Sequence, residues 1–398
     1  MMPSHLLRTV AACALVAVGS GARQVLHAQS TPVSEAIQIS QSGRGAYEVS
    51  LAAGESGLVA AWYDTRNGNA EIYARAVDIR GRPTGPELRL TDNPERSYEA
   101  DVELLGDDIV VAWYDRAATG RLRARVGRWT ADGTRRWAHP LSEHEGSTRN
   151  PLVLVMGETL FCAWLQEEGP GRWAVWVGWL DPSGQRVTAP QRVATAGDRT
   201  WNLNATLDDD GWAWVVFDAA VDTRREELFL VRVSRDGRHV VRLTEDDGFA
   251  SKYPDLVLAG ETAALTWFDE RDGNEEIYLF AAASDQLAAG IDAGLHRVTH
   301  SSGESVGAYL GWNGQQVGLA WSDDHDGQGE IYFQAFEPDG SPLAAPRRLT
   351  DNTTASRIPA IEPIGDGFAL VWNEDVIAER SLSHGTGGRS EIVFLRVE

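Results

Sequence analysis

The sequence predicts an all-β protein, a seven-bladed β-propeller built from four-stranded antiparallel blades. Three observations lead to this prediction. A repeat of about 50 residues occurs seven times, each copy holds four short strand-like runs, and each chain end matches part of one copy. Four strands per repeat is the pattern of propeller blades, whereas solenoid repeats carry fewer.

The repeat is clearest in three segments, WYDTRNGNAEIY (62–73), WFDERDGNEEIY (267–278) and WSDDHDGQGEIY (321–332). Each reads as a strand end, a tight turn and a new strand, because Gly and Asn accept the positive φ of hairpin turns. A Trp-x-Asp column falls at Trp62, Trp113, Trp164, Val216, Trp267, Trp321 and Trp372. A second column, which ends runs like Arg-Leu-Thr, falls at Ser40, Thr91, Ser142, Ala194, Thr244, Thr299 and Thr350. The separation of 22 or 23 residues between the columns in every copy indicates one repeated unit.

The strands follow in order from these columns. In the first complete copy, strands are expected at 47–52, 58–63, 71–77 and 87–91, separated by Gly, Asp, Asn and Pro. Residues 37–40 match the fourth strand of a copy, and residues 391–397 match a third strand. The N-terminal strand should therefore pair beside the C-terminal one, complete the seventh blade and remove an open sheet edge.

The first 28 residues have the features of a secretory signal peptide. His5 and Arg8 precede an apolar stretch at 10–18, small residues follow it, and Leu26-His27-Ala28 offers a cleavage site. A lipoprotein signal ending at Cys13 is the weaker alternative. Residues 29–398 are then a single propeller domain, exported to the periplasm or outside the cell, with no other run near the ~20 apolar residues of a membrane span. Cys162, in an apolar run, is expected to be a buried and inert thiol.

The formal net charge of −22 argues against nucleic acid and anionic membranes as partners. No cofactor or metal site is expected. The acidic stretch 323–330 occupies the hairpin column and reads as a turn rather than a calcium loop. No histidine pair has zinc spacing on a helix, and phosphate loops and nucleophile elbows are absent from the sequence.

The candidate site lies where each fourth strand leads into the next first strand. Innermost strands line the centre of a propeller, so these junctions should ring the mouth of its channel. The predicted ligand-binding residues are Arg44, Tyr47, Arg96, Tyr98, Arg149, Arg199, Trp201, Lys252, Tyr253 and Arg357. Arginine forks suit carboxylates and aromatic faces suit sugar rings, which favours an anionic glycan or an acidic peptide. The alternative is that these cations pair with the Asp of the Trp-x-Asp column and serve structure alone.

Some sequence segments resemble those of known families. DERDGNEEIY followed by HRVTH, and RRLTD followed by Asn352, resemble the repeat of TolB-type propellers. Arg357-Ile358-Pro359 resembles the Arg-Ile-Pro element that carries a substrate-binding arginine in sialidases, with variants at 149–151 and 252–254. The resemblance covers the mature chain at the level of the repeat and implies a propeller fold. The chain has no Asp-box, and its seven copies differ from the six blades usual in both families.

Three functions remain open. The first is an exported, monomeric, non-catalytic binding or scaffold module. The second is a carbohydrate-active enzyme, either a sialidase-like glycoside hydrolase or a polysaccharide lyase, and the third is a purely structural module. The regular repeats favour the first and third, whereas the longer segments 279–295 and 375–390 favour the enzyme.

Overall fold

The structure, a computed structural model, describes residues 35–291, 294–376 and 389–398. The predicted signal peptide with Cys13, and most of the predicted long segment 375–390, lie outside these residues. Among the described residues, no helix is long and apolar enough to cross a membrane.

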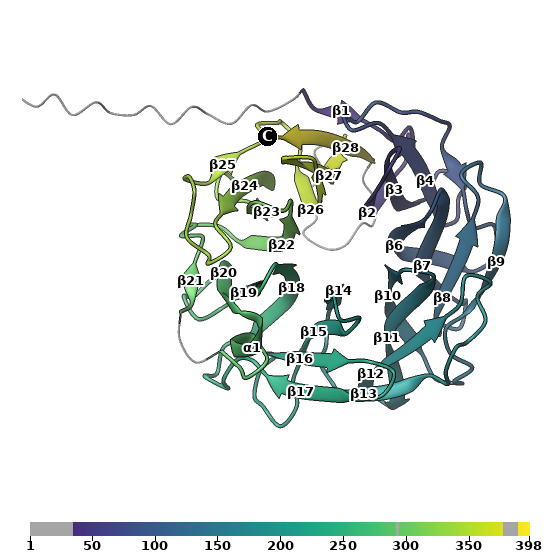
Figure 1. The fold of residues 1–398 in the computed structure, drawn as a ribbon. Helices are drawn as coiled ribbons and strands as arrows, with labels where there is room; N and C mark the ends of the chain where they lie inside the picture. The colour runs from purple at the N-terminus through teal and green to yellow at the C-terminus, as the bar shows by residue number, and fades with distance from the viewer. Residues whose placement is uncertain (1–34, 292–293, 377–388) are drawn as a thin grey trace, which may run out of the picture. The chain divides into compact units, whose positions relative to one another are not determined.

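The seven-bladed propeller is confirmed. Residues from 35 onward form seven four-stranded antiparallel sheets arranged in a ring, with the first strand of each innermost (Figure 1). Blade 1 holds β2 (Ala46–Gly54), β3 (Gly57–Asp64), β4 (Glu71–Val77) and β5 (Leu88–Arg89). Blade 2 holds β6 (Arg96–Leu105), β7 (Asp108–Arg116), β8 (Leu122–Trp129) and β9 (Arg135–Pro140). Blade 3 holds β10 (Thr148–Met156), β11 (Thr159–Gly169), β12 (Arg172–Leu180) and β13 (Gln191–Gly197).

The later blades follow the same plan. Blade 4 holds β14 (Leu203–Leu207), β15 (Ala213–Ala219), β16 (Glu227–Val233) and β17 (Arg238–Arg242). Blade 5 holds β18 (Ser251–Ala259), β19 (Thr262–Asp269), β20 (Glu276–Ala283), the short helix α1 (Ser284–Leu287) and β21 (His296–Arg297). Blade 6 holds β22 (Ser305–Trp312), β23 (Val317–Asp323), β24 (Glu330–Phe336) and β25 (Arg347–Arg348).

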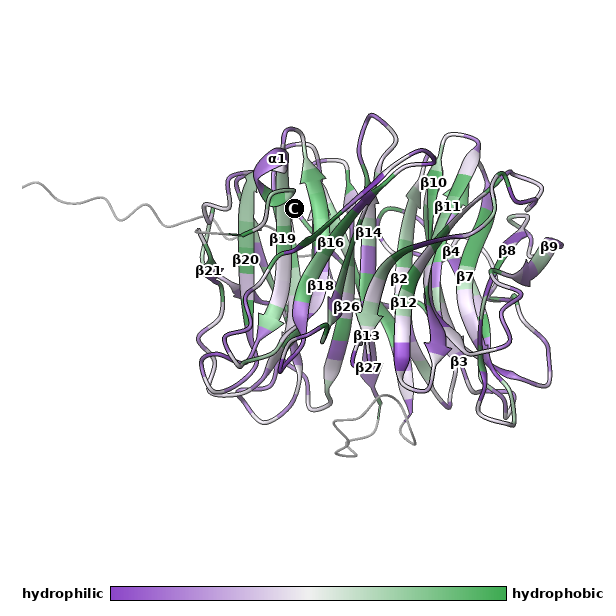
Figure 2. Ribbon diagram, turned by 90° about the horizontal axis from the view of Figure 1, so that it is seen from below, coloured by the Kyte–Doolittle hydropathy of each residue, from purple (hydrophilic) through white to green (hydrophobic). Residues whose placement is uncertain are grey.

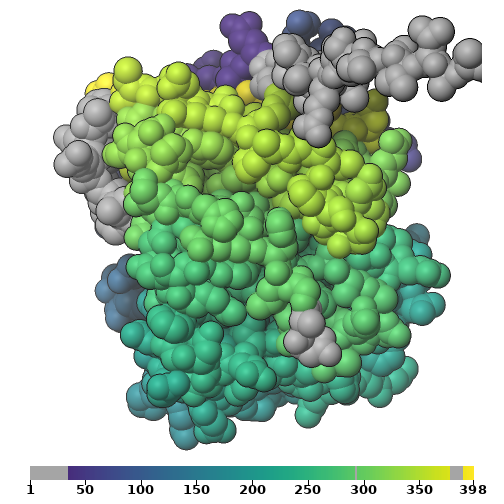
Figure 3. Space-filling model, turned by 90° about the vertical axis from the view of Figure 1, so that its left-hand side faces the viewer, coloured from purple at the N-terminus to yellow at the C-terminus, as the bar shows by residue number. Residues whose placement is uncertain are grey.

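Blade 7 closes the ring by joining the two ends of the described chain. It holds β26 (Ser356–Ile364), β27 (Gly367–Asp375), β28 (Ser390–Val397) and, as its outer strand, β1 (Ile37–Gln38). Ile37 lies opposite Phe394 and Gln38 opposite Val393, in antiparallel register. In the space-filling view, purple residues of the N-terminal strand border yellow residues near the C-terminus (Figure 3). The predicted closure is confirmed.

The Trp-x-Asp column caps the end of each second strand. The indole N–H of Trp267 donates to the carboxylate of Asp269 at 3.0 Å, and the hydroxyl of Ser251 donates to the same group at 2.8 Å. Arg271, two residues after Asp269, pairs with it at 2.8 Å. Trp113 and Asp115 repeat the indole bond at 2.8 Å. In blades 2 and 5 the carboxylate therefore joins residues of its own blade.

The second column fixes the outer strand to the third strand. The hydroxyl of Thr91 donates to Glu71 at 2.6 Å and accepts the N–H of Ile72 at 2.8 Å. Thr244 and Glu227 repeat the first bond at 2.6 Å. Because Glu71 is fully buried, its negative charge is stabilised by the hydroxyl of Thr91 and by Arg89 at 3.1 Å. The sequence repeat is thus a repeated set of buried hydrogen bonds.

The core lies between blades. The predicted inter-blade tryptophans are all buried, none more than 2 % exposed: Trp62, Trp113, Trp164, Trp267, Trp321 and Trp372. Hydrophobic residues run along the strands, and hydrophilic ones gather in the connecting loops (Figure 2). Burying such large rings stabilises the contact between adjacent blades.

Candidate functional site

Six of the seven innermost strands carry a β-bulge near their N-terminal end. The register shifts in β2, β6, β10, β18, β22 and β26, whereas β14 pairs regularly. One residue at each shift has positive φ: Glu48, Glu99, Asn150, Tyr253, Gly307 and Ile358. Positive φ strains every residue except glycine, and such strain gathers at functional sites. The ring of bulges is therefore a candidate for the functional site.

Two glutamates occupy the bulges of blades 1 and 2. Glu48 and Glu99 are both half-buried. Burial raises the pKa of the Glu48 carboxyl, and the nearby charge of Glu99 raises that pKa further. Burial also raises the pKa of Glu99, while Arg149 and the Tyr114 hydroxyl oppose the rise. Burial and the effect of the Glu99 charge on Glu48 therefore disfavour a state in which both carboxyls are ionised.

Tyrosines form a continuous row beside the glutamates. The ring centroids of Tyr47 and Tyr63 lie 5.3 Å apart, those of Tyr63 and Tyr98 5.0 Å, and those of Tyr98 and Tyr114 5.8 Å. The hydroxyl of Tyr114 donates to Glu99 Oε1 at 3.3 Å. Burial, followed by the charge of Glu48, raises the pKa of Tyr63, so this phenol stays protonated.

Blade 3 adds a cation and an amide. Arg149 donates from Nη2 to the carbonyl of Thr200 at 2.6 Å, and its guanidinium lies 4.4 Å from the ring centre of Trp173. Asn150 Nδ2 donates to Glu99 Oε2 at 3.0 Å and to the carbonyl of Trp201 at 3.3 Å. Asn150 thus links the glutamate pair to the junction that carries Trp201.

Blades 4 and 5 meet at Asp218. Its carboxylate accepts the backbone N–H of Trp201 at 2.5 Å and that of Tyr253 at 2.9 Å. Burial raises the pKa of Asp218 to about 6, although these N–H groups act against the rise. The bond from its N–H to Asp218 fixes the backbone of Trp201. Trp201 is 48 % exposed, and its indole N–H donates to Glu226 Oε1 at 3.3 Å.

These groups form one electrostatic neighbourhood. The charges of Glu99 and Asp218 and the hydroxyls of Tyr114 and Tyr253 all act on the pKa of Arg149, which burial lowers. We refer to Glu48, Glu99, Tyr63, Tyr114, Arg149, Asn150, Asp218 and Tyr253 as the central cluster. It holds more carboxyl groups than cations, so it offers hydrogen-bond acceptors, donors and aromatic rings rather than net positive charge.

Other acidic residues of the innermost strands serve structure. Asp101 accepts the N–H of Val153 at 2.7 Å, and Asp255 accepts that of Leu310 at 2.7 Å, each from the next blade. Each bond satisfies a backbone group between neighbouring innermost strands. Burial raises the pKa of Asp101 to about 7 and that of Asp255 to about 6.

The predicted cations are largely neutralised by nearby carboxylates. Lys252 lies 2.6 Å from Glu270, Arg357 3.2 Å from Asp375, and Arg199 3.5 Å from Glu226. Arg44 and Arg96 are exposed beside the ring. Among the predicted residues, Arg149 and Tyr253 enter the central cluster, Tyr98 lies in its tyrosine row, and Trp201 stands next to it.

Sequence reasoning missed both glutamates, Tyr63, Tyr114, Asn150 and Asp218 as site residues. A signal was present, because Tyr-Glu at 47–48 and 98–99 and Trp-Tyr-Asp at 62–64 and 113–115 occur together only in blades 1 and 2. Tyr47, predicted to ring the mouth, is instead buried at 7 % exposure. Within the described ranges, no group of three or more metal-ligating side chains could hold an ion.

Comparisons with known proteins extend the description of the fold. No family model and no curated protein matches the chain. A prolyl endopeptidase structure matches with a TM-score of 0.50 and 14 % identity, over 84 % of this chain and 46 % of that one. The chain thus spans less than half of that enzyme's length. The endosialidase of phage phi92 matches with a TM-score of 0.53 and 9 % identity, over 92 % and 69 % of the two chains.

An α-L-arabinofuranosidase from Fusarium graminearum also matches, with a TM-score of 0.54 and 12 % identity, over 74 % of this chain and 91 % of that one. Identities this low show a shared fold and no more. The resemblance to sialidase-type propellers is confirmed as a likeness of architecture.

Proposed function

We propose that the protein is a binding module that recognises a glycan at the central cluster, with Trp201 as the aromatic platform. The observation that carries this proposal is the convergence of a glutamate pair, two tyrosine hydroxyls, an amide and one guanidinium at strained bulges beside an exposed indole. Sugar recognition uses this combination, in which a flat apolar face meets a ring and polar groups bond its hydroxyls.

The balance of charges at the site limits the class of ligand that it can bind. Lys252, Arg199 and Arg357 already face carboxylates, and the central cluster adds Glu48, Glu99 and Asp218 against Arg149. An acidic peptide would meet repulsion there. A hydroxyl-rich glycan suits the site better, and any acidic group on it would rest on Arg149. Export to the periplasm or the medium, as the first 28 residues predict, belongs to this proposal.

The proposal is tested by a glycan array followed by calorimetric titration. Trp201→Ala should weaken binding of the best glycan at least tenfold while leaving the melting temperature unchanged, because the indole is 48 % exposed. Leu343→Ala, at 47 % exposure in the β24–β25 connection, is the matched control and should alter neither quantity. Absence of any glycan ligand, or wild-type affinity in Trp201→Ala, would refute the proposal.

A second candidate is glycoside hydrolysis. It is favoured by one feature, a half-buried carboxyl pair with raised pKa values and a tyrosine hydroxyl 3.3 Å from one of them. Glycosidases use two carboxyl groups, one of them held protonated as the general acid. Release of sugar from a bound glycan by the wild type, lost in both Glu48→Gln and Glu99→Gln, would establish it. Binding without turnover would leave the binding module.

A further inference from the structure

In three blades the repeat places a tyrosine opposite the tryptophan of the Trp-x-Asp column. Tyr73 lies opposite Trp62 on the neighbouring strand, Tyr278 opposite Trp267, and Tyr332 opposite Trp321. In blades 5 and 6 the two rings stack with centroids 5.7 Å apart and interplanar angles of 23° and 19°. In these two blades a phenol ring therefore stacks on the indole.

A cation from the hairpin turn lies over the phenol ring in two blades. The guanidinium of Arg66 lies 4.5 Å from the ring centre of Tyr73, and that of Arg271 lies 5.1 Å from Tyr278. The arginine also pairs with the Asp of its column. In blade 5 an indole, a phenol ring and a guanidinium therefore lie in sequence, held by stacking and cation–π attraction.

Blade 2 lacks the middle member of this arrangement. The residue opposite Trp113 is Arg125, and the turn position two residues after Asp115 is Ala117. Arg125 takes over the ion pair with Asp115, at 3.3 Å, and its guanidinium lies 5.8 Å from the ring centre of Trp113. The indole and the guanidinium are both present, and the phenol ring between them is missing.

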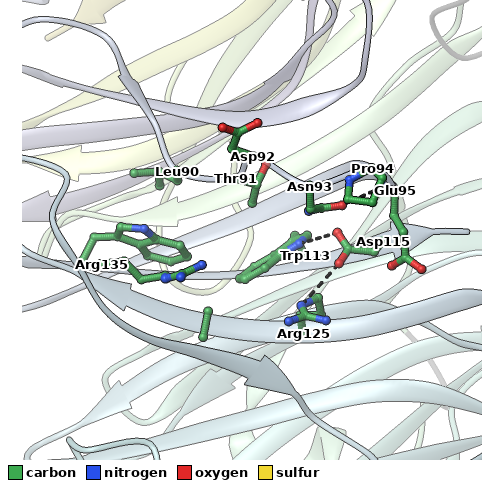
Figure 4. A pocket seen from close by; sticks show the side chains of 12 residues that line it. Leu90, Thr91, Asp92, Asn93, Pro94, Glu95, Trp113, Asp115, Arg125 and Arg135 are labelled. Atoms are coloured by element: carbon green, nitrogen blue, oxygen red, sulfur yellow. Dashed lines mark hydrogen bonds and ion pairs between the residues drawn. The ribbon is translucent and has the colours of Figure 1, made fainter.

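A pocket of about 220 Å³ lies at this place (Figure 4). The loop 90–95 of blade 1 forms one side, and Trp113, Arg125, Trp129 and Arg135 of blade 2 form the other. Figure 4 shows Asp115 bonded to both Trp113 and Arg125 at one end of the pocket. Pockets for drug-sized ligands begin near about 300 Å³, so this one suits a single ring.

We propose that this pocket binds a phenol-type aromatic ring, from a small molecule or from a tyrosine side chain of a peptide. The ring stacks on Trp113 under the guanidinium of Arg125 and restores the arrangement that Tyr278 and Arg271 make within blade 5. Trp113 is 2 % exposed, with Arg125 over its ring and the ring of Trp129 5.7 Å away between centroids, so a bound ring must displace the Arg125 side chain, which is 25 % exposed. Asp92 and Glu95 at the rim offer acceptors for the phenol hydroxyl.

The pocket and the central cluster are separate sites. The pocket lies between β8, β9 and the loop after β5, whereas the cluster lies on the innermost strands. Binding here does not depend on the proposed glycan site, and either can fail without the other.

The experiment uses 4-fluorophenol as the probe, with ¹⁹F line broadening as the measurement. Arg125→Tyr returns the residue that blades 1, 5 and 6 carry, fills the pocket from within and should weaken probe binding at least tenfold. Arg80→Tyr, the same substitution at an exposed turn of blade 1, is the control and should bind as the wild type does. Cyclohexanol, a saturated ring of similar size, should bind at least tenfold more weakly than the phenol.

No line broadening in the wild type would overturn the proposal, as would unchanged binding in Arg125→Tyr. Equal binding of cyclohexanol would do so without any variant, because it would remove the role of stacking. Competition by N-acetyltyrosinamide assigns the site to a peptide side chain, and binding of 4-fluorophenol without that competition assigns it to small phenols.

Discussion

The hydroxyl of Ser40 donates to the carboxylate of Glu391, 351 residues further along the chain, and accepts the N–H of Ile392 at 2.7 Å. Thr91 makes the same two bonds to Glu71 and Ile72 within blade 1. The ring is therefore closed by the bonds that elsewhere hold an outer strand to its own blade. Backbone N–H groups of Ser42 and Gly43 add two further bonds to Glu391, at 2.8 and 2.7 Å.

Ser40→Ala should lower the free energy of unfolding by about 1–3 kcal/mol, because it removes one of three donors from the buried Glu391 carboxylate and takes the hydroxyl acceptor from the buried N–H of Ile392. Thr91→Val, which breaks the same bonds inside one blade, is the matched comparison. Deleting residues 29–41 should lower the melting temperature further or cause aggregation, since it exposes the edge of β28. An unchanged melt after that deletion would show that closure contributes nothing to stability.

Stability should fall as the pH rises through neutrality. Burial raises the pKa of Glu103 and of Glu362 to about 8. The charges of Asp101 and Glu362 add to the rise at Glu103, and the charge of Asp101 adds to the rise at Glu362. With an unfolded value near 4.5, the folded state keeps protons that the unfolded chain has lost. The stabilisation is thus complete below about pH 4.5 and disappears as the pH passes about 8.

Melting curves between about pH 5 and about pH 8.5 check this dependence. Glu362→Gln mimics the protonated carboxyl, so its melting temperature should fall less steeply with pH than that of the wild type. Glu55→Gln, at an exposed turn, is the control for the change of one charge in a chain of net charge −22. Parallel curves for all three proteins would contradict the assignment to Glu362.

Cys162 should be inert in the folded protein. It is fully buried in β11, and burial raises the pKa of its thiol far above the ordinary value. Because the thiolate is the reactive form, a thiol reagent should label almost none of the native protein and one thiol of the mature chain after denaturation. Rapid labelling under native conditions would show that β11 opens readily.

The sequence was sufficient for the architecture because its two columns are made by buried hydrogen bonds. The Glu–Thr bonds and the Trp–Asp bonds need particular side chains, so the blades that make them carry those residues at a fixed spacing. The predicted strand 87–91 proved to be only Leu88–Arg89, since Thr91 serves through its hydroxyl rather than through the sheet. Strand ends that depend on side chains cannot be located from hydrophobic pattern alone.

The site was less accessible to prediction because a bulge changes which side chain faces the centre. Alternation along a strand has a period of two, and one inserted residue reverses it. Tyr47 was expected at the mouth and lies in the core, whereas Glu48, the next residue, joins the central cluster. The ion pairs of the predicted cations could not be foreseen, because the carboxylates that pair with Lys252 and Arg357 come from other strands and turns.

The strained bulges give the last prediction, a trade between stability and binding. Ile358 has φ of 52°, which is costly for a β-branched residue, and blade 6 carries Gly307 at the same position. Strain of about 1–3 kcal/mol at such a residue exceeds the roughly 0.5–1 kcal/mol entropic cost of glycine. Ile358→Gly should therefore leave the free energy of unfolding unchanged or raise it by up to about 1 kcal/mol, and it should not affect ligand binding.

Glu99→Gly relieves the same strain, at φ of 50°, and also removes a buried carboxyl. It should stabilise the protein at least as much as Ile358→Gly, while abolishing glycan binding at the central cluster. Urea denaturation and titration of both variants separate the two effects. If Glu99→Gly destabilises the protein, Glu99 is held in its strained conformation by the bonds from Tyr114 and Asn150 for structure rather than for a ligand. A stabilised variant that has lost its ligand would instead mean that the strain at this bulge is kept for function.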